Sequence, residues 1–190
     1  MPGSTHPYFL CLWCDMRDLA AYSNSSYAPG CGVVARVLWY YVSLVVFESG
    51  WLPSSALKRT VLRLFGASIG RGVVIKPNVR IKCPWRLTVG NEAWIGQDVW
   101  IDNIDDVTIE DSCCLSQGAY LCTGTHDHKS ASFELMTAPI HIKSGAWVAA
   151  KAILLPGAIV EAGQVISAGS VHKRAEGVSL KRYGPQGKRR

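Results

Sequence analysis

Aliphatic residues recur every six positions through most of this 190-residue chain. The repeating positions are Ile69, Ile75, Ile81, Val89, Ile95, Ile101, Ile109, Leu115, Leu121, Ile142, Val148, Leu154, Val160 and Ile166. An α-helix repeats its apolar positions about every 3.6 residues and a strand every two, so neither produces this pattern. A period of six is typical of the hexapeptide repeat of a parallel β-helix, in which three short strands make one triangular coil.

A small or β-branched residue follows most of these positions after four residues. The set is Val73, Val79, Ala93, Val99, Cys113, Ala119, Thr125, Ala146, Ala152, Ala158 and Ser170. Such residues fit the corners of a triangular coil, where the chain turns inward. The alternative is a β-sandwich of short strands, which would show alternating runs with turn signals about every 8 to 12 residues. We therefore predict an all-β solenoid, a parallel β-helix with a cap and an inserted loop.

The chain divides into four regions by composition and periodicity. They are an N-terminal arm (1–30), an apolar and helical cap (31–66), the β-helix (67–172) with an inserted loop (126–139), and a basic tail (173–190). The insertion interrupts the repeat between Leu121 and Ile142. A cap is needed because no coil buries its apolar side alone and an open coil edge invites association.

The cap region predicts two helices. Residues 33–47 are nearly all apolar, which indicates a helix packed across the β-helix or into a subunit contact. A second, shorter helix would be capped by Ser54 or Ser55 and stopped by Gly66, and it would cover the first coil. Its apolar positions share one face: Leu57, Val61 and Leu64.

Cysteine usage and hydropathy indicate a cytoplasmic protein. The seven cysteines form an odd, unpatterned set, which suggests reduced thiols, and the single C-x-x-C at Cys11 and Cys14 is interpreted as chance. The longest apolar stretch is about half of the ~18 residues of a membrane span. The net charge of +6 comes without an aromatic platform or reading motif, so we expect no nucleic-acid partner.

Basic residues concentrate directly after the apolar stretch. Residues 58–86 contain eight Lys or Arg and no Asp or Glu, and they follow the aromatic-rich segment 33–52. Apolar surface beside cations is attracted to an anionic membrane face, so one hypothesis is peripheral contact with the inner membrane. The alternative is a buried trimer contact with a solvated basic rim.

The inserted loop carries the candidate chemistry. It opens with Thr-Gly-Thr-His-Asp, and His126 is the first residue expected beyond the prism. A histidine held on a rigid scaffold suits a general base, although a lone loop histidine is more often solvated. Asp127 would orient His126 or be solvated, and the solvated interpretation is favoured. Cys122 could form a nucleophile pair with His126, but its place on the prism wall argues against this.

A metal site is not expected. A zinc site on such a fold needs three converging histidines, and His126, His128 and His141 put two of the three on one loop.

Long segments of the chain resemble the hexapeptide-repeat acyltransferases, most closely the colanic acid biosynthesis acetyltransferases. They are DLAAYSNSSYAPG (18–30), LWYYV (38–42), LRLFGASIGRGVVIKPNVRIK (62–82), PWRLTVGNEAWIGQDVWIDN (84–103), VTIED (107–111), LSQGAYLCTGTHD (115–127), GAWVAAKAILLP (145–156) and AGSV (168–171). The resemblance implies a left-handed β-helix and a homotrimer with sites between neighbours. It also implies direct acetyl transfer from acetyl-CoA to a sugar hydroxyl, with His126 as the general base.

The same resemblance implies the binding residues. Asn103 and Asp102 would contact the acceptor, although Asn103 could equally be a corner residue in left-handed geometry. The pantetheine arm of acetyl-CoA would run along Trp147, Ala149, Ala168 and Gly169, and Lys173 and Arg174 would meet the 3′-phosphate. The family's Gly-Asn-Pro-Ala stretch near the end is absent from this chain.

We therefore expect an O-acetyltransferase of polysaccharide or glycan biosynthesis. The alternatives are a non-catalytic β-helix that serves as a structural or docking subunit, and acetylation of an amine or another small acceptor. The presence of His126 in its loop argues against a decayed, non-catalytic member.

Overall fold

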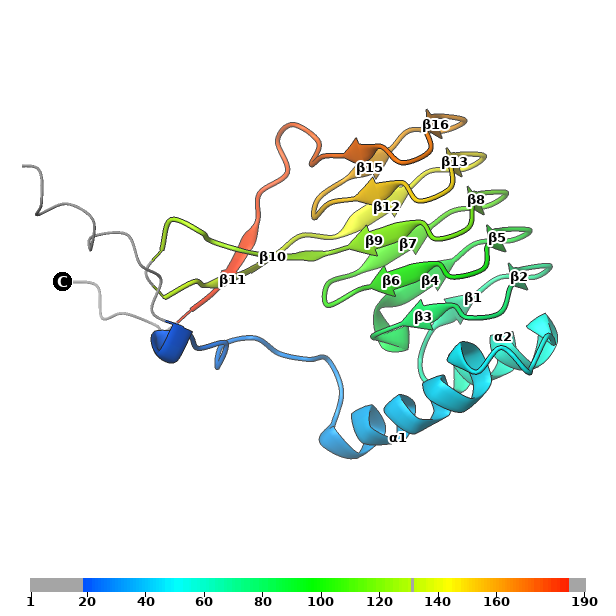
Figure 1. Ribbon diagram of the computed structural model, residues 1–190, viewed down its shortest axis with the longest axis horizontal. Coiled ribbons are helices and arrows are strands. Elements are labelled where there is room, and N and C mark those ends of the chain that lie inside the picture. Colours follow the sequence, from blue (N-terminus) through cyan, green and yellow to red (C-terminus); the bar gives the residue numbers. More distant parts are fainter. Residues whose placement is uncertain (1–18, 131, 185–190) are drawn as a thin grey trace, which may run out of the picture.

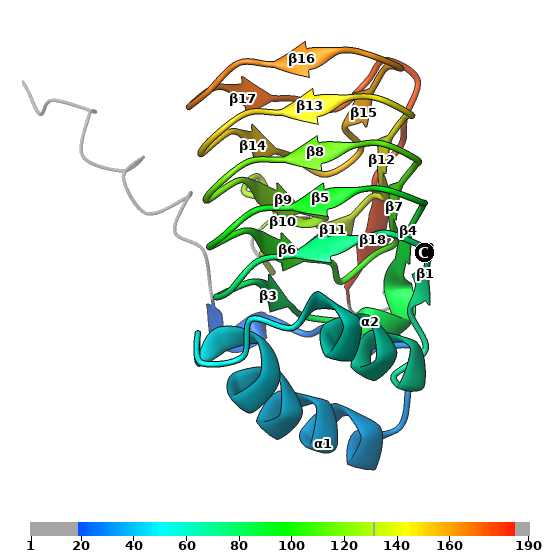
Figure 2. The same cartoon turned by 90° about the vertical axis from the view of Figure 1, so that its right-hand side faces the viewer.

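Three parallel sheets form a triangular prism in the computed structural model, which describes residues 19–130 and 132–184 (Figures 1 and 2). The first sheet contains β1 (Ser68–Ile69), β4 (Leu87–Val89), β7 (Val107–Ile109), β12 (Ile140–Ile142) and β15 (Ile159–Val160). The second contains β2 (Val74–Ile75), β5 (Trp94–Ile95), β8 (Cys114–Leu115), β13 (Trp147–Val148) and β16 (Val165–Ile166). The third contains β3 (Arg80–Ile81), β6 (Trp100–Asp102), β9 (Tyr120–Cys122), β14 (Ile153–Leu154) and β17 (Val171–His172). The predicted parallel β-helix is confirmed.

The core of the prism is the hexapeptide repeat itself. All fourteen repeating aliphatic residues are buried. The strand register stacks them directly, so that Ile75, Ile95, Leu115, Val148 and Ile166 form one ladder in the second sheet. Each coil therefore buries its aliphatic side chains against the coils above and below it, as stacking of repeats requires.

Two helices lie beneath the first coil (Figure 2). Helix α1 (Val33–Ser43) continues as one π-helical segment, η2 (Leu44–Glu48), and α2 (Ser55–Leu64) follows. The hydroxyl of Ser54 accepts a hydrogen bond from the Leu57 N–H at 3.4 Å, so the predicted cap is confirmed. The predicted buried face of α2 is wrong, because Leu64 is 79% exposed whereas Lys58 and Leu62 are fully buried.

The open edge of the first coil explains why Lys58 is buried and Leu64 is exposed. Backbone N–H groups of that coil donate to the second coil, as from Gly70 to the Val89 carbonyl, so first-coil carbonyls point toward the cap. Side chains of the cap donate to these carbonyls: Arg63 to Ile69, Arg59 to Val73, Lys58 to Lys76 and Trp39 to Ile81, at 2.6 to 2.9 Å for the shortest contact of each. A cap of purely apolar side chains would leave buried acceptors unpaired, which costs about 1–3 kcal/mol each.

The basic stretch of residues 58–86 is therefore largely engaged within the fold. Besides the three cations of α2, Lys82 pairs with Asp102 at 2.8 Å and Arg86 lies 3.7 Å from Asp105. Only Lys58 of the eight cations is fully buried, and five of them remain exposed at the surface, so the hypothesis of membrane contact stays a prediction. The outer face of α1 also exposes apolar side chains, with Val34 82% exposed. Within the described ranges, no helix is long and apolar enough to cross a bilayer.

The insertion forms a β-hairpin that projects from the prism (Figure 1). Strand β10 (Gly124–His126) pairs antiparallel with β11 (Leu135–Thr137), and β11 pairs with β18 (Lys181–Tyr183) from the tail. The hairpin thus begins two residues before the predicted loop, and part of the basic tail is a strand of its sheet.

The segment before α1 lies against the lower coils. Its short 3-10 turn η1 (Leu19–Ala21) is followed by contacts to the prism, in which the Tyr27 hydroxyl donates to the Ile104 carbonyl at 2.8 Å. A second 3-10 turn, η3 (Pro84–Arg86), presents the Trp85 indole N–H to the Pro29 carbonyl at 2.8 Å. The predicted arm is therefore packed from residue 19 onward, whereas residues 1–18, with Cys11 and Cys14, lie outside the described residues.

Candidate functional site

The ring of His126 is held by backbone and aromatic contacts at the end of β10. Its Nδ1 lies 2.9 Å from the Phe133 carbonyl oxygen, and its face stacks on the Phe133 ring with 4.4 Å between centroids and 2° between planes. Tyr22 packs edge-on against the His126 ring, with 5.6 Å between the ring centroids. A carbonyl only accepts hydrogen bonds, so Nδ1 carries the proton in the neutral ring and Nε2 presents its lone pair. Among the described residues Nε2 has no hydrogen-bond partner, and a positioned imidazole of this kind is suited to accept a proton.

The neighbouring Asp127 holds the loop and does not orient the ring. One of its oxygens accepts the Lys129 N–H at 3.0 Å, and the other pairs with the Arg182 guanidinium of β18 at 2.5 Å. These hydrogen bonds, led by the one from Lys129, lower the pKa of Asp127. The expectation that Asp127 is solvated is wrong, since its side chain is only 14% exposed.

A buried carboxylate that the sequence analysis missed ties the hairpin to the prism. Asp105 is 1% exposed, and it accepts hydrogen bonds from the Thr137 hydroxyl of β11 at 2.7 Å and from Lys181 of β18 at 3.1 Å. Burial alone would raise the pKa of Asp105, but these hydrogen bonds and one from the Asp106 N–H outweigh it and lower the pKa. The only sequence signal is its place in the two-residue corner extension between Ile101 and Ile109.

Asn103 has a structural role within this chain, and its contact with an acceptor stays a prediction. The residue is fully buried in this chain. Its amide nitrogen donates to the Cys83 carbonyl at 2.6 Å, and its amide oxygen accepts the Cys83 N–H at 2.9 Å. Asn103 also lies outside the left-handed region, so it is not the alternative corner residue. Its amide replaces a strand pairing between two coils where the chain leaves the sheet.

Asp102 belongs to a polar and aromatic strip on the outer face of the third sheet. It pairs with Lys82 at 2.8 Å, and the Tyr120 hydroxyl lies 3.4 Å from its second oxygen. Tyr120 stacks on Trp100 with 4.7 Å between centroids, and Arg80 lies 4.4 Å above the Trp100 ring. Desolvation is the largest cause that raises the pKa of Tyr120, so its hydroxyl stays protonated. The strip thus combines aromatic faces with hydrogen-bonding groups on the outer face of one sheet.

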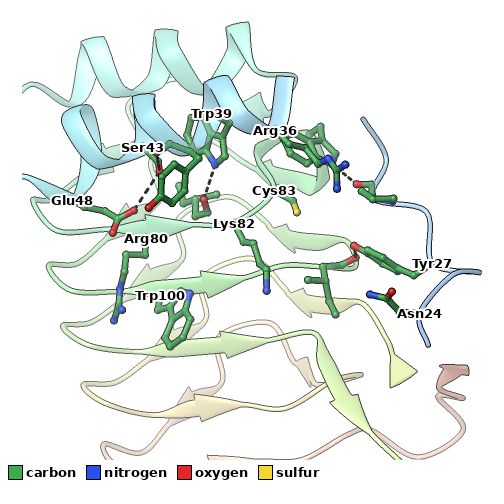
Figure 3. A pocket seen from close by; sticks show the side chains of 15 residues that line it. Asn24, Tyr27, Arg36, Trp39, Ser43, Glu48, Arg80, Lys82, Cys83 and Trp100 are labelled. Carbon is green, nitrogen blue, oxygen red and sulfur yellow. Dashed lines mark hydrogen bonds between the residues drawn. The ribbon is translucent and has the colours of Figure 1, made fainter. Parts of the chain in front are cut away.

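A cavity of about 580 Å³ lies between α1 and this strip (Figure 3). Trp39 and Tyr40 of α1 form one side, and Arg80, Lys82 and Trp100 form the other.

The cavity reaches the base of the hairpin through Ile104. This residue also lines the cavity, and its side chain fills the space that a Cβ on Gly124 would need, with 2.4 Å between the two positions. Gly124 begins β10, the strand that ends with His126. Ile104 therefore joins the cavity to the base of the hairpin, whereas His126 is not among the residues that line the cavity.

The predicted cofactor residues separate into two groups. Trp147 is exposed on the second sheet, where its indole N–H donates to the Ser116 hydroxyl at 2.8 Å. Ala149 is buried, whereas Ala168 and Gly169 are exposed, and all three lie at the edge between the second and third sheets. A Cβ on Gly169 would meet no atom, and its φ is +67°.

Lys173 and Arg174 lie at the opposite edge of the third sheet. They are exposed after β17 and line a hollow of about 420 Å³ together with Gly124 and Thr125, which directly precede His126. A single chain therefore brings Lys173 and Arg174 near the hairpin but does not bring Ala168 and Gly169 to it.

The other candidate chemistries do not assemble. The Cys122 thiol donates to the Gly124 carbonyl at 3.0 Å, while the His126 Nδ1 faces Phe133. His141 pairs with Glu110 at 2.6 Å on the first sheet, away from the hairpin. In the ranges that the structure describes, no three His, Cys, Asp or Glu side chains gather as metal ligands would.

Comparison with known sequences identifies relatives over most of the chain. No protein-family model matches. The chain is 38% identical over 157 residues to the protein named "Putative colanic acid biosynthesis acetyltransferase WcaF" of Escherichia coli K12, covering 82% of this chain and 85% of that protein. The protein of the same name from Shigella flexneri matches with the same identity and coverage.

Solved structures share the fold at lower identity. A hexapeptide-repeat-containing acetyltransferase of Vibrio cholerae, solved with acetyl-CoA, superposes with a TM-score of 0.65 at 17% identity, covering 78% of this chain and 85% of that one. A maltose O-acetyltransferase of Clostridium difficile 630 gives a TM-score of 0.59 at 16% identity, with coverages of 81% and 88%. The expected hexapeptide-repeat β-helix is confirmed by this agreement.

Proposed function

This chain belongs to the family of the colanic acid biosynthesis acetyltransferases, and on that premise we propose that it transfers an acetyl group from acetyl-CoA to a sugar hydroxyl in glycan biosynthesis. The observation that carries the proposal is the contact of His126 Nδ1 with the Phe133 carbonyl. That contact leaves Nε2 as the proton acceptor, and the aromatic strip with Asp102 offers a surface for the sugar.

In the proposed reaction, His126 Nε2 removes the proton of the acceptor hydroxyl while that oxygen attacks the thioester carbonyl. The new C–O bond gives a tetrahedral oxyanion, which a backbone N–H would stabilise. When the C–S bond breaks, the protonated His126 returns its proton to the leaving thiolate, so that the ester and free CoA are formed. The reaction needs no acetyl-enzyme, which agrees with the Cys122 thiol being directed at Gly124.

The separated cofactor residues support a homotrimer with active sites between neighbours. Ala168 and Gly169 present small, open positions on which a pantetheine arm would fit, but they lie across the third sheet from His126. A neighbouring copy whose edge faces the hairpin would supply the missing half of the site. Lys173 and Arg174, at the hairpin edge, would then meet the phosphates of acetyl-CoA.

We place the reaction in the cytoplasm. Cys31, Cys83, Cys113, Cys114 and Cys122 are all free thiols in the structure, which fits a reducing compartment.

The test is acetyl-CoA turnover with a panel of sugar acceptors, measured as released thiol and as acetylated product by mass spectrometry. His126→Ala should lower kcat by about 10²- to 10⁴-fold, the usual contribution of a general base, while the Kd for acetyl-CoA stays within about twofold. Cys122→Ser is the matched control and should keep its turnover. Normal turnover of His126→Ala, or acetylation confined to amino groups, would contradict the proposal.

A further inference from the structure

Helix α1 exposes an apolar face on the side that points away from the prism. The buried side chains of α1 and η2 recur every four residues: Trp39, Ser43 and Phe47. At 3.6 residues per turn, the opposite side of the helix carries aliphatic and tyrosine side chains that are more than half exposed, among them Val34, Val37, Tyr41 and Val45. Residues 33–47 contain a single charged residue, Arg36. An apolar face of this length on a surface helix indicates an interaction site.

This face lies at one end of the molecule. In Figures 1 and 2, α1 lies beyond the first coil, at the end of the prism opposite to β16. The proposed homotrimer joins copies along the edges between sheets, which run along the sides of the prism, so that contact does not cover α1. A cyclic trimer whose copies meet side by side places all three capped ends on the same side.

The same end of the molecule carries an excess of positive charge. Residues 19–90 contain nine Lys or Arg and one acidic residue, Glu48, whereas residues 91–110 contain six Asp or Glu and no Lys or Arg. The three cations of α2 donate to backbone carbonyls, which fixes their positions without neutralising their charge. Within the described ranges, Lys82 and Arg86 are the only two of the nine that pair with a carboxylate. The capped end is therefore an apolar face bordered by uncompensated cations.

We propose that the capped end is a membrane-docking surface. The outer face of α1 enters the headgroup region of an anionic bilayer, and the surrounding cations face the lipid phosphates. Trp51, which follows η2 and is 64% exposed, adds an aromatic side chain of the kind that is enriched at membrane interfaces. A second copy of the chain docked face to face on α1 would bring like charges together, which opposes that association.

Vesicle sedimentation of the full chain tests this surface. We expect binding to vesicles of phosphatidylglycerol and phosphatidylethanolamine to be at least about tenfold tighter than binding to phosphatidylcholine vesicles, and to weaken as salt rises. The measurement involves no catalytic step, so its outcome is independent of the proposed acetyl transfer. His126→Ala should bind the vesicles as the parent protein does, because His126 lies on the hairpin and not at the capped end.

A pair of serine substitutions tests the apolar half of the surface. Val34→Ser combined with Val37→Ser removes apolar contact without changing the charge, and it should weaken binding to the anionic vesicles about tenfold or more. Val165→Ser is the matched control, because Val165 is 54% exposed in β16 at the other end of the prism. Its affinity for the vesicles should equal that of the parent protein.

Two glutamine substitutions test the charged half. Lys76→Gln removes an exposed cation of the first coil and should weaken binding to the anionic vesicles about fivefold, the usual contribution of one cation near an anionic surface. Lys151→Gln changes the net charge equally, but Lys151 is exposed in a later coil, between β13 and β14. The Lys151→Gln protein should therefore bind as tightly as the parent.

Four results would overturn the proposal. If the parent protein binds neither kind of vesicle, the capped end is not a membrane surface. Equal binding to phosphatidylcholine vesicles would show that the cations take no part. An equal loss in Lys76→Gln and Lys151→Gln would show attraction through the net charge alone. A lower mass of the Val34→Ser, Val37→Ser protein than of the parent, measured by analytical ultracentrifugation without lipid, would show that a second copy of the chain covers α1.

Discussion

At the scale of single residues, the buried carboxylate of Asp105 helps to position the His126 ring. The Nε2 of His126 carries the lone pair of the neutral ring because one backbone carbonyl occupies Nδ1. That carbonyl is positioned by the hairpin that Asp105 fastens to the prism. Asp105 touches neither ring nor proposed substrate. It acts as a positioning residue, through Thr137 in the strand that pairs with β10.

We predict that Asp105→Asn destabilises the protein in a pH-dependent way. The folded pKa of Asp105 is lowered, so its stabilising effect is complete above the carboxyl pKa of the unfolded chain, about 4, and is lost as the pH falls through the folded pKa. At neutral pH the variant should lose about 1–3 kcal/mol of unfolding free energy, because the Thr137 hydroxyl, the Asp106 N–H and the Lys181 ammonium lose a charged acceptor.

Urea unfolding of both proteins at pH 7 and at pH 3 measures this difference. The gap between parent and variant should narrow at the lower pH. Asp106→Asn, at the exposed neighbouring position, is the control and should cost little at either pH. A gap that is the same at both pH values would show that the charge of Asp105 is not what stabilises the hairpin.

At the scale of elements, two cations of the tail strand β18 form ion pairs with carboxylates at the two ends of the hairpin. In a solvated tail, the same cations would be available to a cofactor. Lys181 pairs with Asp105 and Arg182 with Asp127, so both ends of the hairpin are held by one strand. In a solvated tail, these two cations would be free to add to the charge of Lys173 and Arg174. The tertiary contacts assign them to the positioning of β10 and β11.

Truncation after Val178 separates the two roles. Loss of β18 should loosen the hairpin and lower kcat about tenfold or more, since catalytic geometry is sensitive to small displacements. The Kd for acetyl-CoA should change less than kcat. Truncation after Gly184, which keeps β18 and removes the last basic residues, is the control for charge.

Steady-state kinetics and calorimetric titration of acetyl-CoA distinguish the outcomes, and hydrogen exchange in residues 127–134 reports the loop directly. The truncation could instead weaken acetyl-CoA binding, reduce the salt dependence of that binding and leave kcat unchanged. That result would show that Lys181 and Arg182 contact the cofactor.

At the scale of the whole molecule, the prism has one covered end. The cations of α2 donate hydrogen bonds to the carbonyls of the first coil, so the cap pairs the polar edge of that coil while the prism interior stays apolar. Such an edge would otherwise offer a template for pairing with another chain.

Lys58→Met should therefore destabilise the protein and promote self-association. Methionine fills a similar volume but leaves the Lys76 carbonyl without its 2.9 Å partner, a loss of about 1–3 kcal/mol. Thermal unfolding and light scattering measure the two effects. Arg71→Met, at an exposed position of the same coil, should change neither. Unchanged stability in Lys58→Met would mean that the edge carbonyls need no donor from the cap.

The sequence by itself determined the prism, its coils, the position of the insertion and the place of His126. It could do so because a coil that stacks only on its neighbours repeats the same inward position every six residues, and this leaves a local, periodic record. The capping hydroxyl of Ser54 is also a local signal, three residues from its partner.

The tertiary structure decided what the polar residues do. Three buried polar residues have partners about twenty or more residues away or across a coil edge: Asn103, Asp105 and Lys58. The spacing of residues along the chain does not predict such partners. The burial of Lys58 in place of Leu57 follows from carbonyls that exist only once the first coil has formed. Gly169 and His126 also lie apart, at opposite edges of the third sheet. The distance between two residues of a prism depends on the face that each occupies, and the position in the repeat does not give that distance.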